Sequence, residues 1–175
     1  SYIDFPSFAD GRWMGGKQLP DAQLGWASLT ATGGHPGAKY AAIRRWTAPF
    51  HGIVEIGGTV NHPSKEGNGV RLAVISEGKQ WRLHTVKGRR LPLGRIKLAV
   101  KAGQVIDFVA DNSGDTSHDS FEWLIKLHFS SRKGDVIDFD SESDFSGQRN
   151  RSGPRLLNRF EQLAQTLLLS NEFAF

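Results

Sequence analysis

A chain of 175 residues with 38% hydrophobic and 23% charged residues is long enough for one domain with a hydrophobic core. It holds no run of about 20 apolar residues, so no membrane span is expected, and the absence of cysteine excludes disulfides, thiolate nucleophiles and cysteine-based zinc sites. Residues 1–10 lack the charged and apolar blocks of a signal peptide, so any export signal is expected upstream, in a longer parent protein.

Short apolar runs alternate along the chain with turns rich in glycine, of which there are 20, and this punctuation is typical of β-strands. No helical pattern alternates with them, which argues against a parallel sheet. Eight or nine strands at intervals of roughly ten residues predict an all-β fold over residues 1–130, an antiparallel β-sandwich or jelly roll. The predicted strands are residues 12–14, 24–30, 41–47, 53–60, 70–76, 80–86, 95–100, 105–110 and 121–129.

The clearest hairpin spans residues 70–86. Because side chains alternate between the two faces of a strand, Arg71 is expected to lie opposite the apolar residues of its own strand. In the second strand, Arg82 and His84 are expected on one face and Trp81 on the other.

Two further segments follow the predicted sandwich. Residues 131–153 are polar, acidic and rich in glycine and serine, and are expected to form a linker. Residues 154–175 carry apolar side chains at helical spacing and predict one C-terminal α-helix. We expect this helix to dock on the sandwich, on the rest of the parent polypeptide, or on a second copy of the chain in a homo-oligomer. Its apolar positions are Leu156, Leu157, Phe160, Leu163, Ala164, Leu167 and Leu168.

Charged residues are unevenly distributed along the chain. Residues 71–101 hold nine basic residues and one acid, whereas residues 102–148 hold ten acids and three basic residues. Two interpretations are open: an anion-binding face, or pairing of the two blocks with each other across neighbouring strands.

Several motifs in combination resemble a known family. They are residues 11–21 (GRWMGGKQLPD), 24–29 (LGWASL), 33–37 (GGHPG), 43–49 (IRRWTAP), 52–57 (GIVEIG), 67–70 (GNGV), 102–108 (AGQVIDF), 119–123 (DSFEW) and 160–173 (FEQLAQTLLLSNEF). Together they resemble the β-sandwich segment and the extreme C-terminus of the large planctomycete cytochrome-c-associated proteins of unknown function. The resemblance spans most of the chain and is weakest over residues 79–95 and 132–155.

That resemblance implies a sandwich like that of a carbohydrate-binding module, within an exported parent protein of the periplasm or cell surface. It carries over no catalytic residue. Because this chain lacks the cytochrome part, it implies no haem here.

Sugar-binding sites use aromatic rings that cover the C–H face of a pyranose, flanked by polar groups that bond its hydroxyls. Trp81 is the leading candidate for such a ring, and the alternative is that Trp81 faces the core. Arginine forks match carboxylate and sulfate groups, so an anionic polysaccharide is the expected ligand. Trp26 and Trp123 lie among apolar neighbours and are expected in the core. The predicted carbohydrate-binding residues are Trp81, Arg71, Arg82, His84, Trp46 and Arg44.

Four aspartates surround one predicted strand end and offer the hard oxygen ligands that Ca²⁺ prefers. The predicted calcium ligands are Asp107, Asp111, Asp115 and Asp119. The alternative is that Asp119 caps a turn through bonds to the backbone.

Catalysis is not expected, because neither an HExxH nor a GxSxG motif occurs. Nucleic acid is not an expected partner either, because the pI of about 9.6 comes without a recognition-helix, RRM or zinc-finger pattern. The sequence therefore predicts a non-catalytic carbohydrate-binding module that tethers an exported, cytochrome-linked protein to a polysaccharide. The alternative is a structural domain that packs against its parent protein or another subunit.

Overall fold

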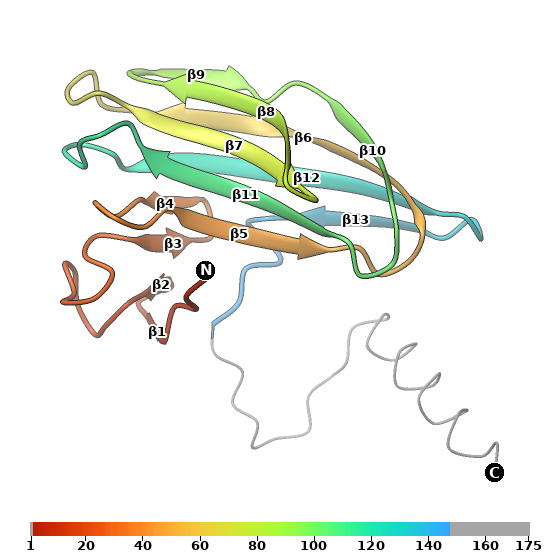
Figure 1. Cartoon of the computed structure of the whole chain (residues 1–175), viewed down its shortest axis with the longest axis horizontal. Coiled ribbons are helices and arrows are strands. Elements are labelled where there is room, and N and C mark those ends of the chain that lie inside the picture. The colour runs from red at the N-terminus through yellow and green to blue at the C-terminus, as the bar shows by residue number, and fades with distance from the viewer. Residues whose placement is uncertain (1, 148–175) are drawn as a thin grey trace, which may run out of the picture.

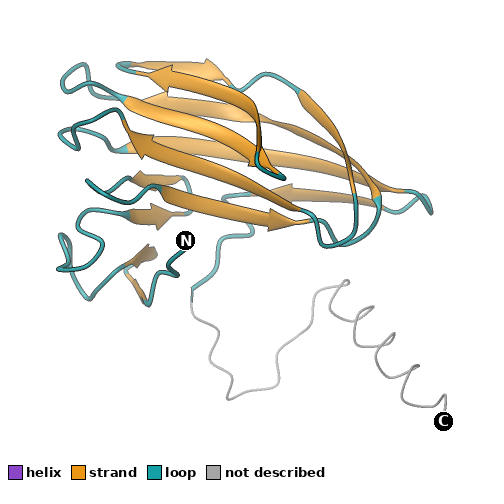
Figure 2. Cartoon of the chain, in the orientation of Figure 1, coloured by secondary structure: helices purple, strands orange, loops and turns teal. Residues whose placement is uncertain are grey.

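The computed structural model of the chain describes residues 2–147, and the regular structure in this range is entirely β (Figure 2). Two antiparallel sheets stack face to face, as Figure 1 shows. This confirms the predicted all-β fold with the character of a sandwich. The predicted C-terminal helix, residues 154–175, lies outside the described residues.

The larger sheet is built around the long strands β6 (Gly52–His62) and β12 (Phe121–Ser131), which pair antiparallel from Gly52↔Ser131 to Asn61↔Glu122. Two short strands flank each of them: β4 and β13 pair with β12, and β9 and β10 pair with β6. The other strands of this sheet are β1 (Ser7–Ala9), β2 (Arg12–Met14), β3 (Ser28–Thr30), β4 (Gly33–His35), β9 (Arg89–Pro92), β10 (Ile96–Val100) and β13 (Val136–Asp140).

The smaller sheet has four strands in the order β5-β11-β7-β8. Their bounds are β5 (Ala42–Thr47), β11 (Val105–Asn112), β7 (Val70–Ser76) and β8 (Lys79–Val86). The predicted hairpin is the β7–β8 pair, in which both turn residues, Glu77 and Gly78, have positive φ. A register shift between Val74 and Ile75 places a bulge near the β8 end of this turn.

The core lies between the sheets and follows the period of two that strands impose. In β12, every second residue from Phe121 to Phe129 is buried, with Trp123 among the least exposed side chains of the molecule. Across the interface, β11 contributes Phe108, whose ring meets that of Trp123 edge to face at a centroid distance of 5.7 Å. The alternation that predicted the strands is thus the alternation that fills the core.

Residues 24–30 form a shorter strand than predicted, because residues 21–27 make turns and only Ser28–Thr30 pairs. In this turn, Leu24 and Ala27 take the buried positions, and Trp26 is 47% exposed. The prediction of a core position for Trp26 is therefore wrong, whereas that for Trp123 is confirmed.

The segment after residue 130 differs from the expected linker. Val136–Asp140 forms β13, which pairs antiparallel with β12 from Ser130↔Val136 to Lys126↔Asp140. Ile137 is buried in the core, and Phe139 and Phe145 pack against it. The folded module therefore extends past residue 130 at least as far as Phe145.

Candidate functional site

The outer face of the smaller sheet, which is the face turned away from the core, is unusually apolar. Alternation directs residues such as Leu72 of β7 and Phe108 of β11 into the core, so their neighbours along each strand point outward. A sheet with one solvated face normally carries polar residues there. The apolar residues that alternation directs to the outer face are Ile43, Ala73, Ile75, Leu83, Val105 and Val109.

Trp81 is an exposed aromatic side chain at the edge of the smaller sheet, at the bulge between Gln80 and Arg82. It lies on the edge strand β8 and is 41% exposed, and Leu83 beside it is 45% exposed. The Lys79 ammonium lies 4.1 Å from the centroid of the Trp81 ring, a cation–π contact. The alternative that Trp81 fills the core does not hold, because its side chain is exposed. In β8 the fully buried residue is Val86.

Two arginine–aspartate pairs bound the apolar strip. Arg71 donates to the Asp111 carboxylate across the β7–β11 pairing. Arg45 donates two hydrogen bonds to Asp107, at 2.7 and 2.9 Å, and the Tyr2 hydroxyl donates a third at 2.9 Å. The Arg71–Asp111 pair is partly exposed and presents donors and acceptors at the surface, as a ligand rich in hydroxyls requires, whereas Asp107 is buried.

Asp107 is held ionised by its partners. Its burial opposes ionisation, but the hydrogen bonds from Arg45 and Tyr2 outweigh the burial and keep the pKa of Asp107 below its usual value. We expect Asp107→Asn to lower the free energy of unfolding by about 1 kcal/mol at neutral pH, a modest loss because water screens the exposed Arg45.

The pH dependence of this loss has a definite sign. A depressed carboxyl pKa stabilises the fold above the unfolded value of about 3.9, and this contribution disappears as the pH falls through the folded pKa. Denaturant unfolding of wild type and Asp107→Asn between pH 3 and pH 7 should therefore show a difference that closes in acid. A difference that stays constant with pH would contradict the role given to the ionised carboxylate.

Arg82 and His84 pair with Val74 and Leu72, whose side chains face the core, so both lie on the inner side of β8. His84 Nε2 is 3.3 Å from the Leu93 carbonyl, and Arg82 Nε is buried without a hydrogen-bond partner. Of the other predicted residues of this hairpin, only Arg71 lies on the outer face. Thr85, not Trp81, is the cross-strand neighbour of Arg71.

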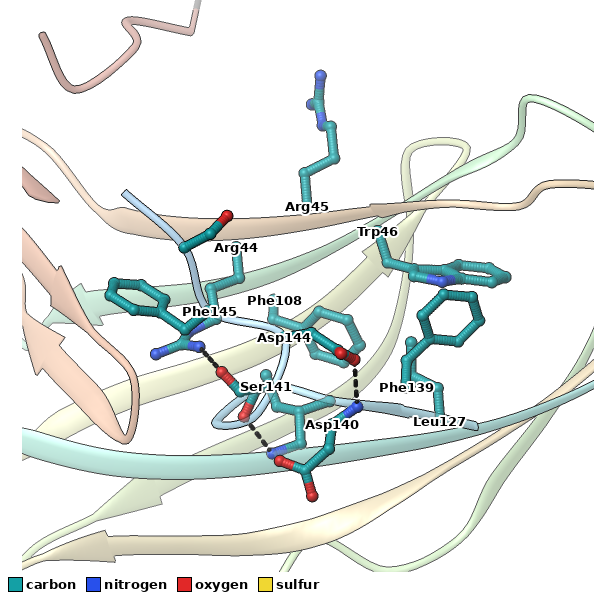
Figure 3. A pocket seen from close by; sticks show the side chains of 12 residues that line it. Arg44, Arg45, Trp46, Phe108, Leu127, Phe139, Asp140, Ser141, Asp144 and Phe145 are labelled. Atoms are coloured by element: carbon teal, nitrogen blue, oxygen red, sulfur yellow. Dashed lines mark hydrogen bonds between the residues drawn. The ribbon is translucent and has the colours of Figure 1, made fainter. Parts of the chain in front are cut away.

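Trp46 and Arg44 lie together elsewhere, in an edge pocket between β5 and β13 (Figure 3). The edge pocket has a volume of about 310 Å³. Trp46 packs on Phe139 at a centroid distance of 5.7 Å, and its indole N–H is buried without a partner. The aromatic residues that line the pocket are Trp46, Phe108, Phe139 and Phe145.

Arg44 is committed to the protein backbone rather than to this pocket. One terminal nitrogen donates to the Ser141 carbonyl at 2.9 Å, and the other donates toward the carbonyls of Thr30, Ala31 and Gly33. Burial lowers the pKa of Arg44 to about 10, so the group stays charged at neutral pH. Its donors are therefore occupied by backbone carbonyls, and Arg44 holds the pocket wall in place.

The four predicted calcium ligands are not brought together. Asp107 and Asp111 are bonded by arginines, and Asp115 accepts bonds from the N–H and hydroxyl of Ser117. Asp119 is fully buried, and burial, with the nearby Asp115 and Asp111, raises its pKa to about 6. Within residues 2–147, no three residues of the types His, Asp and Glu gather closely enough to hold a metal ion.

In the described part of the chain, two ion pairs join the two charge blocks, one across the adjacent strands β7 and β11 and one across the intervening strand β6. Besides the Arg71–Asp111 pair, Arg90 donates to Glu122 at 2.9 Å. The pairing interpretation accounts for these two arginines, whereas Lys97 pairs with Glu55, which lies outside both blocks, and Lys79 contacts the Trp81 ring.

The fold and the outer face define a class of protein: a two-sheet antiparallel β-module with an exposed aromatic side chain on one sheet. Comparisons with protein-family models, with curated proteins and with solved structures give no match for this chain. Among the described residues, no helix is long and apolar enough to cross a bilayer.

Proposed function

We propose that this domain is a non-catalytic carbohydrate-binding module that holds a polysaccharide on the outer face of the smaller sheet. The observation that carries the proposal is the ring of Trp81, which is 41% exposed on the edge strand β8. In line with the family resemblance, the module would tether a larger exported protein to its ligand.

The chemistry of the outer face supports this proposal. A pyranose presents C–H groups on its faces and hydroxyls around its rim, so it is bound by an apolar surface with polar groups at the margin. Trp81 and Leu83 offer the apolar surface, and the Arg71–Asp111 pair offers donors and acceptors along the same face. The Lys79 ammonium adds a positive charge beside the ring, which favours a uronic or sulfated polysaccharide.

Substitution of Trp81 tests the proposal. We expect Trp81→Ala to weaken binding to polygalacturonate, measured by affinity gel electrophoresis, by about 10-fold or more, because a central aromatic side chain contributes most to such an interface. Stability should change by no more than about 0.5 kcal/mol, since the ring is exposed. Trp26→Ala is the matched control, because Trp26 is equally exposed but lies away from the smaller sheet.

The outcomes separate two classes of function. Retardation of wild type and Trp26→Ala, but not of Trp81→Ala, supports glycan binding. The absence of retardation on polygalacturonate, a sulfated galactan and a neutral xylan would reject it.

The second candidate is a structural domain, favoured by the number of aliphatic residues on the outer face, since extended apolar patches mark protein contacts. For this candidate we expect sedimentation to detect a dimer, or a complex with the upstream region of the parent, that Leu83→Asp dissociates. A monomer that does not bind the upstream region would exclude this second candidate.

A further inference from the structure

A fully buried histidine and aspartate face each other at one end of the sandwich, away from the outer face. His62 is the last residue of β6, and Asp119 lies just before β12. The β6–β12 register brings these chain positions side by side. Both side chains are completely inaccessible to solvent, and His62 Nε2 lies 4.0 Å from Asp119 Oδ1.

This distance is too long for a hydrogen bond, and neither group has another partner at these atoms. His62 Nε2 and both carboxylate oxygens of Asp119 are buried and unbonded. A buried ionisable group without a partner is strongly unfavourable, so such an arrangement calls for something that fills the gap.

The state of the His62 ring follows from its other nitrogen. His62 Nδ1 lies 2.9 Å from the Ser64 carbonyl oxygen, which only accepts, so Nδ1 carries a proton. The Gly88 N–H is directed at the same nitrogen from 3.4 Å, and we infer the tautomer from the shorter contact to Ser64. In the neutral ring Nε2 therefore presents its lone pair toward the carboxylate of Asp119, so two acceptors face each other.

We propose that His62 and Asp119 bind a divalent transition-metal ion of the Zn²⁺ type, which holds the loops at residues 63–69 and 113–119 together. Metal-binding histidines commonly donate their second ring N–H to a backbone carbonyl, as His62 does to Ser64. Zn–N and Zn–O distances of about 2.0–2.2 Å separate the ligand atoms of a tetrahedral site by about 3.4 Å, so binding would draw the two atoms, now 4.0 Å apart, closer by about half an ångström.

Asn68 provides a further oxygen in the same region. Its Oδ1 is also buried without a partner, and the loop that carries it packs against the 113–119 loop, where Gly67 lies directly against the Ser117 carbonyl. A set of imidazole, carboxylate and amide donors suits Zn²⁺ better than Ca²⁺, which takes six to eight oxygen ligands. The proposed Zn²⁺ site shares only Asp119 with the predicted calcium cluster. Its other ligands are His62 and Asn68.

The test uses the full chain after treatment with EDTA and removal of the chelator. We expect calorimetry to detect one Zn²⁺ per chain, and a Zn²⁺ concentration 100-fold above Kd to raise Tm by about 5–10 °C. Asp119→Asn and His62→Gln should abolish both effects. The matched controls Glu66→Gln and His118→Gln, which alter the exposed His118–Glu66 pair beside the site, should retain them.

A second measurement covers the case in which the buried variants fail to fold. Long-range ¹H–¹⁵N spectra of the wild-type imidazoles should show the Nε2 resonance of one Nδ1-protonated histidine shift when Zn²⁺ is added. The proposal is overturned if the wild type binds no stoichiometric Zn²⁺, if folded Asp119→Asn and His62→Gln bind it like wild type, or if Ca²⁺ stabilises the chain in preference to Zn²⁺. Because polygalacturonate retardation depends on Trp81 on another surface, its outcome is independent of this one.

Discussion

Replacing Arg44 with methionine should lower the free energy of unfolding by roughly 3 kcal/mol. Four carbonyls accept hydrogen bonds from this guanidinium, three in the β3–β4 turn and one at Ser141 after β13. Methionine fills a similar length but donates nothing, so these partly buried carbonyls lose a shared donor. Lysine keeps the charge but not the planar fork, so Arg44→Lys should recover only part of the loss.

Chemical denaturation followed by tryptophan fluorescence measures this effect, with Arg89→Met as control because Arg89 is an exposed β-strand arginine of the larger sheet. Arg89→Met should lie within about 0.5 kcal/mol of wild type. If Arg44→Met were as stable as wild type but lost polygalacturonate binding, Arg44 would be a ligand-binding residue, as its sequence pattern predicted, rather than a clamp on the backbone.

The different fates of the predicted residues show what alternation can and cannot predict. Alternation places Arg82 and His84 on the inner side of β8, opposite Val74 and Leu72, but the bulge at Trp81 interrupts it there. It did not decide which face is buried, because the smaller sheet carries apolar residues on both faces, such as Leu72 inside and Leu83 outside. Only the position of the second sheet decides that, and strand pairing over long sequence separations sets this position.

In two segments the average composition led to a wrong structural prediction. Residues 136–140 (VIDFD) place Ile137 and Phe139 at every second position, which is a strand signal, but the surrounding acids and serines predicted a linker. The opposite happened at Trp26, where apolar neighbours predicted a buried strand and the chain forms a turn. In both places the local pattern of burial carried more information than the average composition.

The candidate sites depend on contacts that no local motif encodes. His62 and Asp119 are far apart in the sequence and meet because β6 pairs with β12. The predicted aspartate cluster failed for a related reason: the cross-strand arginines of β5 and β7 bond Asp107 and Asp111 separately. The alternation of apolar residues on β7 and β11 was the available signal for the outer face, since it leaves Ile75 and Val109 outside the core.

A single methyl group at position 58 should strongly destabilise the module. Gly58 has φ of +130°, in a region that side chains with a Cβ rarely adopt, and a Cβ built there would overlap the Leu124 carbonyl oxygen of the paired strand β12. The backbone cannot retreat easily, because the Gly58 carbonyl also accepts a hydrogen bond from Leu93 N–H at 3.0 Å. We expect Gly58→Ala to lower the free energy of unfolding by about 3 kcal/mol or more, which for a chain of this size lowers Tm by roughly 6–12 °C.

Its neighbour supplies the control for this prediction. Gly57 lies at the next position in β6, has no positive φ, and a Cβ built on it meets no atom within 4 Å. Gly57→Ala should therefore match wild type within about 0.5 kcal/mol or slightly exceed it, since alanine restricts the unfolded chain. The two glycines lie where the partner of β6 changes from β10, which pairs up to Ile56, to β9, which pairs from Thr59. Equal Tm values of the two alanine variants in thermal unfolding would contradict the close approach of β6 to β12 at Gly58. The same strand register brings His62 to Asp119, so that outcome would also count against their juxtaposition.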